Sequence, residues 1–246
     1  MNPSEYKTMF EVEERHWWYV GMQTITQTLI AQAFNGRHDL QILDAGCGTG
    51  AVMRYLGAFG QVTGGDISPL ALQFCQQRQL SRLTQTSVMH LPFPSDSFDL
   101  VTSFDVIYHQ AVSEYRQALS DFWRVLKPNG RLFLRVPAYN WLRGHHDDVV
   151  HTKHRFTAPE LGRALAQSGF IIEKLSYTNT LLFPLALAKR LAERLQPPAE
   201  EASDVQANPE WQDKLFVQFL NAEAKWLSRA SLPFGLTVLA MGRKPL

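Results

Sequence analysis

The sequence predicts an α/β fold, in which helices cover both faces of a mostly parallel sheet of seven strands. Short apolar runs alternate along the chain with segments that carry apolar residues at three- and four-residue steps, which is the pattern of strands followed by helices. The first of these apolar runs ends in a glycine-rich turn, as is typical at the carboxyl edge of such sheets. With 246 residues, of which 45% are hydrophobic, the chain can bury the core of one large domain.

The elements are expected in a regular order. A helical pattern over residues 4–34 ends before Gly36, and Ser68 and Pro69 suit the N-cap and first turn of a later helix. A Lys-Pro-Asn-Gly turn at 127–130 should end the helix before it. The expected strands are 40–44, 61–66, 84–88, 98–104, 131–136, 170–177 and 236–241, and the expected helices are 52–59, 69–79, 113–126 and 157–168. Because the two kinds alternate, the strands should run parallel with right-handed crossovers.

A long segment separates the last two expected strands. It holds roughly sixty residues, far more than the 2 to 6 of an ordinary connection, so we interpret it as an insertion. Two helices are expected in it, at 182–195 and 209–229, joined by a segment at 196–208 that is rich in proline, alanine and acid and should be mobile.

The composition limits the classes of partner and compartment. Lys and Arg total 24 against 23 Asp and Glu, so the net charge is +1 and nucleic acid is not expected as a partner. The two cysteines, Cys47 and Cys75, form no metal or disulfide pattern, which favours a reducing, cytoplasmic setting. We expect no signal peptide, because the N-terminal residues are acidic where a signal segment would be basic and then apolar, and no membrane span, because no run reaches about 18 apolar residues. The composition does not define the oligomeric state.

The most informative stretch is the turn after the first expected strand, where Gly46, Gly48 and Gly50 stand at alternate positions. Glycine allows the backbone to turn sharply and lets a ligand lie directly against the main chain. Asp66 ends the second expected strand, where a carboxylate accepts hydrogen bonds from both hydroxyls of a ribose. Together they predict a cofactor with a nucleoside at the carboxyl edge of the sheet.

The details of this turn favour S-adenosylmethionine over a nicotinamide dinucleotide. A dinucleotide site prefers Gly-x-Gly-x-x-Gly, whereas here the glycines alternate. Asp44, just before the turn, would repel a pyrophosphate but suits an ammonium or a sulfonium. A nicotinamide oxidoreductase is therefore the disfavoured alternative.

Four motifs in sequence order resemble those of the class I S-adenosylmethionine-dependent methyltransferases. The similarity covers about residues 42–136, and the motifs are at 44–50, 66–68, 91–101 and 126–130. The alternative is that the glycine turn only joins a strand to a helix. The resemblance implies a Rossmann-like fold in one domain, with an N-terminal helical cover at 1–36, a cofactor-binding core at 37–180, a helical insertion or lid at 181–230 and the last strand at 231–246.

The resemblance also implies roles for individual residues. Gly46 and Gly48 would face the methionine part of the cofactor with Asp44 beneath them, and Asp66 would hold the ribose. Ser87 stands where the family usually has an acid, so the Ser hydroxyl or backbone groups would read the adenine. Ile67 would cover one adenine face, and Phe104 would offer its carbonyl to the ammonium. The full expected cofactor set is Asp44, Ala45, Gly46, Cys47, Gly48, Gly50, Asp66, Ile67, Ser87, Val88, Met89 and Phe104.

The expected catalytic residues follow the fourth strand. Methyl transfer mainly requires that donor and acceptor be aligned, and a base is needed only when the attacking atom must lose a proton. Asp105, Tyr108 and His109 lie at this point, and His109 resembles a histidine found there in small-molecule members of the family. We expect His109 and Tyr108 to be catalytic. The alternative is that His109 binds a helix end and only lines the pocket.

A polar loop after the fifth strand also opens on this edge. It contains histidines and aspartates at 145–148, then His151, His154 and Arg155. We expect these residues to close the acceptor pocket, with Arg155 holding a carboxylate or a phosphate. They have no dedicated metal-ligand spacing, so no metal is expected, although zinc or another divalent ion is an alternative. A second alternative is that histidine and aspartate side chains pair with each other and only brace the loop.

The N-terminal segment 13–19, Glu-Glu-Arg-His-Trp-Trp-Tyr, resembles a bacterial subgroup in which a helix covers the cofactor. Trp17 and Trp18 point about 100° apart on a helix, so that one can pack on the sheet and the other can face a ligand; a core role for both is the alternative. The apolar segment 181–188 should form a lid with Phe216, Phe219, Leu220 and Trp226 as partners, and a membrane-surface helix is its alternative. The expected acceptor-binding residues are Trp17, His109, His146, Arg155 and Phe183.

These patterns together predict methyl transfer to an oxygen, nitrogen or carbon atom of a small or amphipathic molecule. Two alternatives remain open at this point. One is an enzyme that uses the same cofactor for different chemistry, and the other is a cofactor-binding regulator or scaffold without catalysis. Peripheral membrane contact is not expected.

Overall fold

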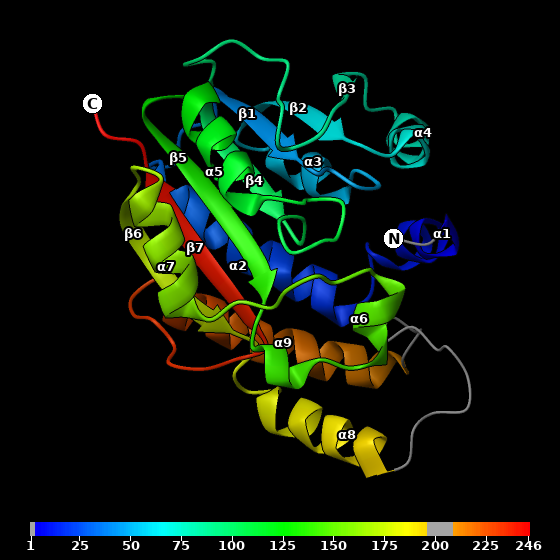
Figure 1. The fold of residues 1–246 in the computed structure, drawn as a ribbon. Coiled ribbons are helices and arrows are strands. Elements are labelled where there is room, and N and C mark those ends of the chain that lie inside the picture. Colours follow the sequence, from blue (N-terminus) through cyan, green and yellow to red (C-terminus); the bar gives the residue numbers. More distant parts are fainter. Residues whose placement is uncertain (1–2, 196–208) are drawn as a thin grey trace.

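In the computed structural model, which describes residues 3–195 and 209–246, seven strands form one sheet in the order β3-β2-β1-β4-β5-β7-β6. β7 runs antiparallel to both of its neighbours, and the other strands are parallel, which confirms the predicted fold class (Figure 1). The strands are β1 Leu40–Ala45, β2 Gly60–Asp66, β3 Leu83–Gln85, β4 Phe98–Phe104, β5 Leu126–Pro137, β6 Ile171–Thr178 and β7 Thr237–Arg243.

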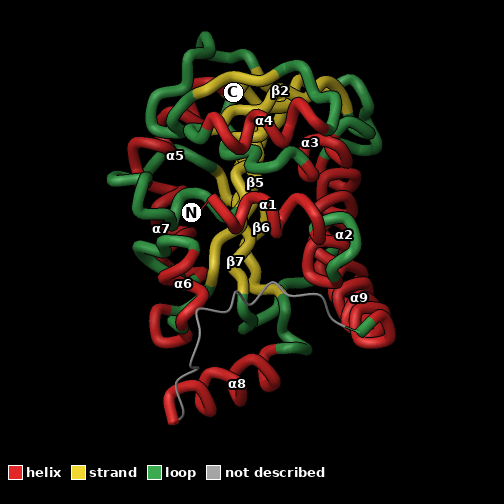
Figure 2. Tube along the Cα trace, turned by 90° about the vertical axis from the view of Figure 1, so that its right-hand side faces the viewer, coloured by secondary structure: helices red, strands yellow, loops and turns green. Residues whose placement is uncertain are grey.

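Helices cover both faces of the sheet. Figure 2 shows α2, α3 and α9 on one face and α5 and α7 on the other, with α8 lying below both layers. The helices are α1 Pro3–Val12, α2 Trp17–Ala33, α3 Ala51–Leu56, α4 Pro69–Gln77, α5 Tyr115–Val125, α6 His145–Val149, α7 Ala158–Gln167, α8 Phe183–Leu195 and α9 Glu210–Leu227, with a short 3₁₀ turn at Asn140–Leu142.

The two layers of core follow from the alternation of side chains along each strand. On β1, Ile42 packs toward α2 and α9, whereas Leu43 packs toward α5 and α7. On β5, Leu132 and Leu134 join the second layer and Phe133 joins the first. Arg135, two residues after Phe133, therefore also points to the face that α2 covers.

The N-terminal helix is broken, contrary to the expectation of one helix over residues 4–34. α1 ends at Val12, and α2 starts again at Trp17. His16 has an extended backbone (ψ 133°), and its Nδ1 accepts a hydrogen bond from the Trp18 amide, so it caps α2. The break arises because a residue that caps the second helix cannot also continue the first.

Two expected strands have different bounds. Only Leu83–Gln85 pairs with β2, and the hydroxyl of Thr86 donates to the carbonyl of His90, which turns the chain away from the sheet. The expected turn at 127–130 lies inside β5, which begins at Leu126. A register shift between Phe98 and Leu100 and a φ of 62° at Asn129 accommodate it as an irregularity of the strand.

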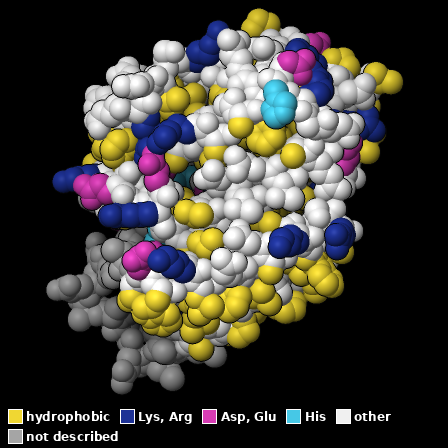
Figure 3. Space-filling model, turned by 180° about the vertical axis from the view of Figure 1, so that it is seen from behind, with side chains coloured by type: hydrophobic (Ala, Val, Ile, Leu, Met, Phe, Trp, Pro, Cys, Tyr) yellow, Lys and Arg dark blue, Asp and Glu magenta, His cyan; other side chains and the backbone are white. Residues whose placement is uncertain are grey.

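The two insertion helices form, but α9 packs differently from the expectation. α9 lies along α2, where Gly21 lets Leu220 approach so closely that a Cβ there would lie 2.1 Å from the Leu220 Cδ1. Of the expected lid partners on α9, Leu220 packs against Gly21 and Phe216 against the Trp17 ring, both on α2, whereas Trp226 is exposed. Figure 3 shows this face of the molecule, with apolar side chains gathered along its lower edge. The segment 196–208, expected to be mobile, lies outside the described residues.

The fold brings the functional elements to one edge. The carboxyl ends of β1, β2, β4 and β5 meet there, and α1 lies beside this edge (Figure 1). Because β7 is reversed, its first residue, Thr237, pairs with the last residue of β6, Thr178, so the insertion leaves and rejoins the sheet at the same edge. In the described ranges, no helix is long and apolar enough to cross a membrane.

Candidate active site

The glycine turn after β1 adopts the conformation that its sequence indicates. Gly46, Gly48 and Gly50 have φ values of 87°, 53° and 89°, in the left-handed region. The amides of Gly46 and Cys47 both donate to the carbonyl of Gly65, at 2.7 and 3.0 Å. The turn is therefore held against the end of β2, where Asp66 follows.

Asp66 organises the space beside this turn. One carboxylate oxygen accepts the Gly48 amide and the other accepts the Ser68 amide, both at 2.9 Å. Burial raises the pKa of Asp66, and these hydrogen bonds to the backbone oppose the increase. Because each carboxylate oxygen can accept a second hydrogen bond, Asp66 can still bind two hydroxyls from the pocket that it lines.

Asp44 lies at the end of β1, only 1% exposed. Its Oδ1 accepts a hydrogen bond of 2.8 Å from the Thr102 hydroxyl, whereas its buried Oδ2 has no hydrogen-bond partner among the residues that the structure describes. Burial raises the pKa of Asp44 to about 7, although Thr102 and the charge of Arg135 oppose the increase. The carboxylate lies beneath the glycine turn and outside the pocket lining, so its charge favours a cationic ligand above the turn through the electric field and not by direct contact.

A large pocket opens at this edge of the sheet. Its volume of about 1130 Å³ exceeds the usual range of about 300–1000 Å³ for a single ligand, so it has room for a cofactor and an acceptor. The predicted site residues that line it are Trp17, Gly46, Cys47, Gly48, Asp66, Ile67, Ser87, Val88, Phe104, Tyr108, His109 and Arg155.

Five predicted site residues lie outside the pocket lining. Asp44 and Ala45 are buried in β1. A Cβ on Gly50 would lie 3.0 Å from the Cys75 sulfur, so this glycine serves packing against α4. The Met89 sulfur accepts a hydrogen bond of 3.6 Å from the Ser113 hydroxyl. Phe183 packs against the rings of Tyr139, Trp141 and Phe234.

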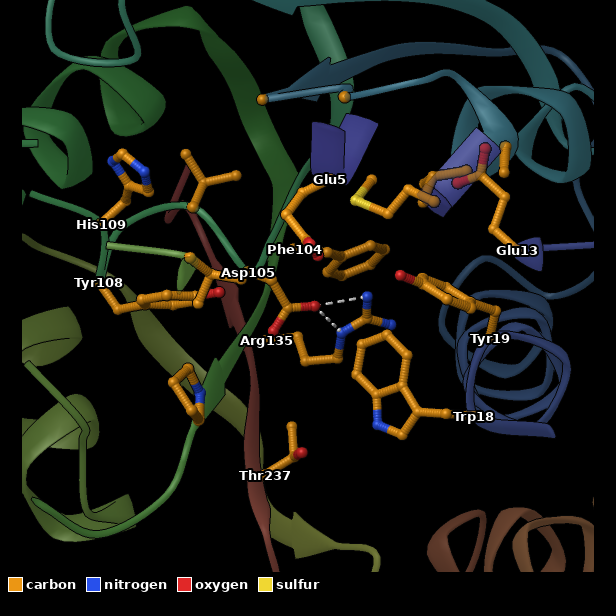
Figure 4. A pocket seen from close by; sticks show the side chains of 18 of the residues that line it. Glu5, Glu13, Trp18, Tyr19, Phe104, Asp105, Tyr108, His109, Arg135 and Thr237 are labelled. Carbon is orange, nitrogen blue, oxygen red and sulfur yellow. Dashed lines mark hydrogen bonds and ion pairs between the residues drawn. The ribbon is translucent and has the colours of Figure 1, made fainter. Parts of the chain in front are cut away.

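The pocket contains a polar group that sequence reasoning missed. Arg135 on β5 pairs with Asp105, which follows β4, and the Arg135 Nε and Nη2 each lie 2.7 Å from the same Asp105 oxygen. Trp18 and Phe104 each place a ring centroid 4.8 Å from the guanidinium carbon. Figure 4 shows the guanidinium between these two rings. The sequence pattern that could have indicated this residue is an arginine in an otherwise apolar strand, two positions after Phe133 and therefore on the same face.

Tyr108 lines the pocket, as Tyr19 and Tyr55 do. Burial raises the pKa of all three phenols above the usual value of 10. At neutral pH each hydroxyl is therefore protonated and can donate a hydrogen bond, but cannot act as a base without first losing its proton at high energetic cost.

His109 also lines the pocket, and burial together with the nearby His151 lowers its pKa to about 4. The ring centroids of the two histidines are 5.7 Å apart. The Ala111 amide donates to the Nδ1 of His109 at 3.0 Å. In the neutral ring Nδ1 therefore carries the lone pair and Nε2 carries the proton.

The loop expected to close the acceptor pocket is braced by an ion pair. Arg155 Nε donates to Asp147 at 2.8 Å, and its Nη1 donates to the carbonyl of Ala138 at 3.0 Å. Arg155 is thus engaged with the protein itself, whereas the expectation was that it holds a ligand anion. The side chains of His145 and His146 lie outside the described part of the structure. Among the side chains that are described, no cluster of three or more potential ligands can hold a metal ion.

A second ion cluster, also missed from the sequence, fixes the break between α1 and α2 over the glycine turn. Arg78, at the end of α4, donates to Glu13 at 2.6 Å, to Glu14, and to the carbonyl of Thr49 at 3.0 Å. The Thr49 hydroxyl also donates to Glu13. Because the side chains of Arg78 and Glu13 are 6% and 4% exposed, this pairing is little screened by water.

Comparison with known proteins supports this interpretation of the edge. Residues 43–134 match the family described as "Methyltransferase domain". Over 130 residues the chain is 35% identical to a demethylmenaquinone methyltransferase of Lactiplantibacillus plantarum, which covers 48% of this chain and 50% of that protein. The chain thus spans about half the length of this curated relative.

Solved structures share the fold at low sequence identity. A chain of the Haloferax volcanii complex that contains the Trm112 methyltransferase activator has a TM-score of 0.64 and 20% identity, over 99% of this chain and 94% of that one. A Haemonchus contortus phosphoethanolamine N-methyltransferase, solved with S-adenosyl-L-methionine, has a TM-score of 0.58 and 19% identity, over 90% of this chain and 53% of that one.

The family match begins at residue 43, so the resemblance of segment 13–19 to a particular subgroup stays a prediction. The match includes the glycine turn, Asp66 and β4, which form the floor of the pocket. Residues 43–134 therefore match a methyltransferase domain in sequence, and the chain as a whole shares its fold with solved methyltransferase structures.

Proposed function

We propose that the protein transfers the methyl group of S-adenosylmethionine to a small or amphipathic acceptor. The observation that carries this proposal is the unpartnered Oδ2 of Asp44, buried just before a glycine turn that Asp66 closes on its other side. A carboxylate in this position suits a cation, and a carboxylate at the end of β2 suits a ribose. The H. contortus methyltransferase solved with the same cofactor and the likeness to a demethylmenaquinone methyltransferase support it.

Each part of the site has a definite task in this proposal. Gly46 and Gly48 keep side chains away from the ligand, Asp66 binds the ribose hydroxyls, and Ile67, 54% exposed and in the pocket lining, covers the adenine. Bound S-adenosylmethionine supplies a methyl group on a sulfonium that is already a good leaving group. The chain therefore has to orient the acceptor and exclude water, and the helices α1 and α2 over the pocket serve both purposes.

The geometry of His109 favours a hydrogen-bond donor over a general base. Its Nδ1 is engaged by the Ala111 amide, so the neutral ring presents a proton on Nε2. A proton acceptor would require the other tautomer and the loss of that hydrogen bond. We therefore propose that His109 positions an acceptor oxygen or nitrogen, with Tyr108 as a second hydroxyl donor.

The first test is calorimetric titration of the protein with S-adenosylmethionine and with S-adenosylhomocysteine, for the wild type and Asp66→Ala. Both ligands contain the ribose, so the substitution should weaken both by about 1–3 kcal/mol, the cost of losing a charged hydrogen-bond partner. Asp39→Ala, at a fully exposed position, is the matched control and should change neither affinity. Absence of binding by the wild type would overturn the proposal.

A second test concerns His109. Because its pKa is about 4, His109 stays neutral from pH 5 to pH 8. The pH profile of kcat should therefore have the same shape in the wild type and in His109→Gln over this range. Glutamine keeps an N–H donor and should retain activity within about tenfold, whereas His109→Leu should lose about 10–100-fold. A wild-type step near pH 6.5 that disappears in both variants would instead indicate a general base.

Product analysis distinguishes the two alternatives to methyl transfer. A methyltransferase releases S-adenosylhomocysteine in equal amount to methylated product. An enzyme of other chemistry would leave the cofactor unchanged or yield a different fragment, and a binding regulator would bind the cofactor without turnover with any acceptor.

A further inference from the structure

Arg135 has an unusual environment for a buried cation. Its side chain is 8% exposed, it lines the pocket, and Nε and Nη2 both contact a single oxygen of Asp105. The two residues are also joined through the backbone, because the Asp105 amide donates to the Arg135 carbonyl at 2.9 Å. Asp105 adopts a φ of 60°, in the left-handed region, which aspartate tolerates better than most residues with a side chain. The pair is therefore rigid before any ligand arrives.

The guanidinium lies between two rings, Trp18 and Phe104, each with its centroid 4.8 Å from the guanidinium carbon (Figure 4). The N–H groups of a guanidinium lie in its plane, so its hydrogen bonds form at its edge. One edge faces Asp105. The third nitrogen, Nη1, makes no hydrogen bond to a residue in the described ranges, and in Figure 4 it carries no dashed line and points to the side of Tyr19.

We propose that the Nη1 edge of Arg135 is the recognition site for an oxygen atom of the methyl acceptor. This inference rests on the proposed function, because it assigns the acceptor part of the same pocket. The oxygen belongs to a carbonyl or a hydroxyl on an aromatic or apolar body, since Trp17, Val112, Leu142 and Leu182 line other parts of the pocket.

The charge balance favours an uncharged oxygen over a carboxylate. Asp105 already compensates the charge of Arg135, and Asp147 is compensated by Arg155 elsewhere in the pocket. A further carboxylate would bring an unpaired negative charge into a buried site, which is costly. A carbonyl or hydroxyl accepts the same hydrogen bond from Nη1 without that cost.

The test compares two small probes, 2-naphthol and 2-fluoronaphthalene, which differ at one polar substituent. Calorimetric titrations of the wild type, with and without S-adenosylhomocysteine, should show that 2-naphthol binds about tenfold or more tightly than 2-fluoronaphthalene, as expected for a hydrogen bond to a charged donor. In Arg135→Met the affinity for 2-naphthol should fall to that for 2-fluoronaphthalene. Equal affinities in the wild type, or no binding of either probe, would overturn the proposal.

Arg131→Met is the matched control. Arg131 lies on the same strand, pairs with Glu173 at 2.7 Å and stacks over Phe34 at 5.0 Å, but it does not line the pocket. Arg131→Met should still bind 2-naphthol more tightly than 2-fluoronaphthalene. Loss of this preference in Arg131→Met would contradict a specific role for Arg135. The affinity for S-adenosylhomocysteine, measured in the same titrations, tests the proposed function separately.

Asp105→Asn provides a variant with an effect of opposite sign. Asparagine tolerates positive φ at least as well as aspartate, so the backbone should be kept. With the compensating charge removed, Arg135 should bind the anion 2-naphthoate about tenfold more tightly than the wild type does. An unchanged or weaker affinity for 2-naphthoate in a folded variant would show that the pair only holds the strands together.

Discussion

Asp44→Asn should make the ligand-free protein more stable at pH 8 and at the same time weaken S-adenosylmethionine binding. The pKa of Asp44 is about 7 in the folded chain, above the usual value of 3.8. A raised pKa means that the favourable protonated form dominates at low pH and is lost as the pH rises through 7. Above pH 7 the folded protein therefore contains a buried charge with an unpartnered oxygen, and its cost is up to about 4 kcal/mol, at about 1.4 kcal/mol for each pKa unit.

Urea unfolding at pH 5 and pH 8 measures this effect. The free energy of unfolding of Asp44→Asn should exceed that of the wild type at pH 8 by one to a few kcal/mol, on the order of the linkage above. At pH 5 the gain should be much smaller, because Asp44 is then protonated. Asp39→Asn, on a fully exposed residue, should change the free energy of unfolding little at either pH. A variant that is less stable than the wild type at pH 8 would show that Asp44 is not strained without a ligand.

The same group predicts how cofactor affinity depends on pH. Between pH 5 and 7 the wild type should bind S-adenosylmethionine up to about tenfold more tightly for each pH unit, because binding requires the carboxylate, and the affinity should level off above pH 7. Asp44→Asn should bind more weakly and lack this slope. If the variant keeps the slope, another group controls the pH dependence.

Gly46→Ala should destabilise the protein far more than Gly48→Ala, although both glycines belong to the same turn. A Cβ on Gly46 would lie 2.2 Å from the Val106 Cγ2, and its φ of 87° is strained for alanine. A Cβ on Gly48 would meet only the Met9 Cε at 3.5 Å, an ordinary contact, at a φ of 53°. We expect a loss of about 3 kcal/mol or more for Gly46→Ala and about 1–2 kcal/mol for Gly48→Ala.

Thermal and urea unfolding of the two variants check this difference without any ligand. The double variant Gly46→Ala with Val106→Ala separates the two causes, because it removes the contact and keeps the backbone strain. The loss of stability in the double variant should be smaller than the sum of the losses in the two single variants, Gly46→Ala and Val106→Ala. Equal losses for the two glycine variants would contradict the role assigned to Val106.

The order of strands and helices was accessible from sequence because apolar periodicity and local caps define each element. Ser68 caps α4 as predicted, accepting the Ala71 amide at 3.4 Å. The break between α1 and α2 was not accessible, because Trp17 and Trp18 continue the apolar pattern across it. Besides the local cap by His16, a long-range contact holds the break: Glu13 pairs with Arg78, which lies more than sixty positions away along the chain.

The candidate site could be predicted where it depends on backbone conformation and not where it depends on side-chain partners. Alternate glycines and an acid at the end of the next strand identify the turn and its neighbour, since local geometry alone requires them. The sequence offers no comparable signal that Arg135 meets Trp18, because their contact depends on how α2 lies on the sheet. For the same reason Phe183 was expected in the pocket, whereas the structure places it in an aromatic cluster outside the lining.

The pairing of Thr178 with Thr237 has a consequence for how such a chain can diversify. The two ends of the long excursion that contains α8 and α9 are neighbours in the sheet, so its removal or replacement would leave every other strand pairing in place. Lengthening such a closed excursion adds only a small entropic cost, which grows with the logarithm of its length. The glycine turn and Asp66, in contrast, belong to the unbroken strand framework. The part of the pocket lining that the excursion supplies, which includes Leu182, Leu185 and Phe216, can thus change without moving the glycine turn or Asp66.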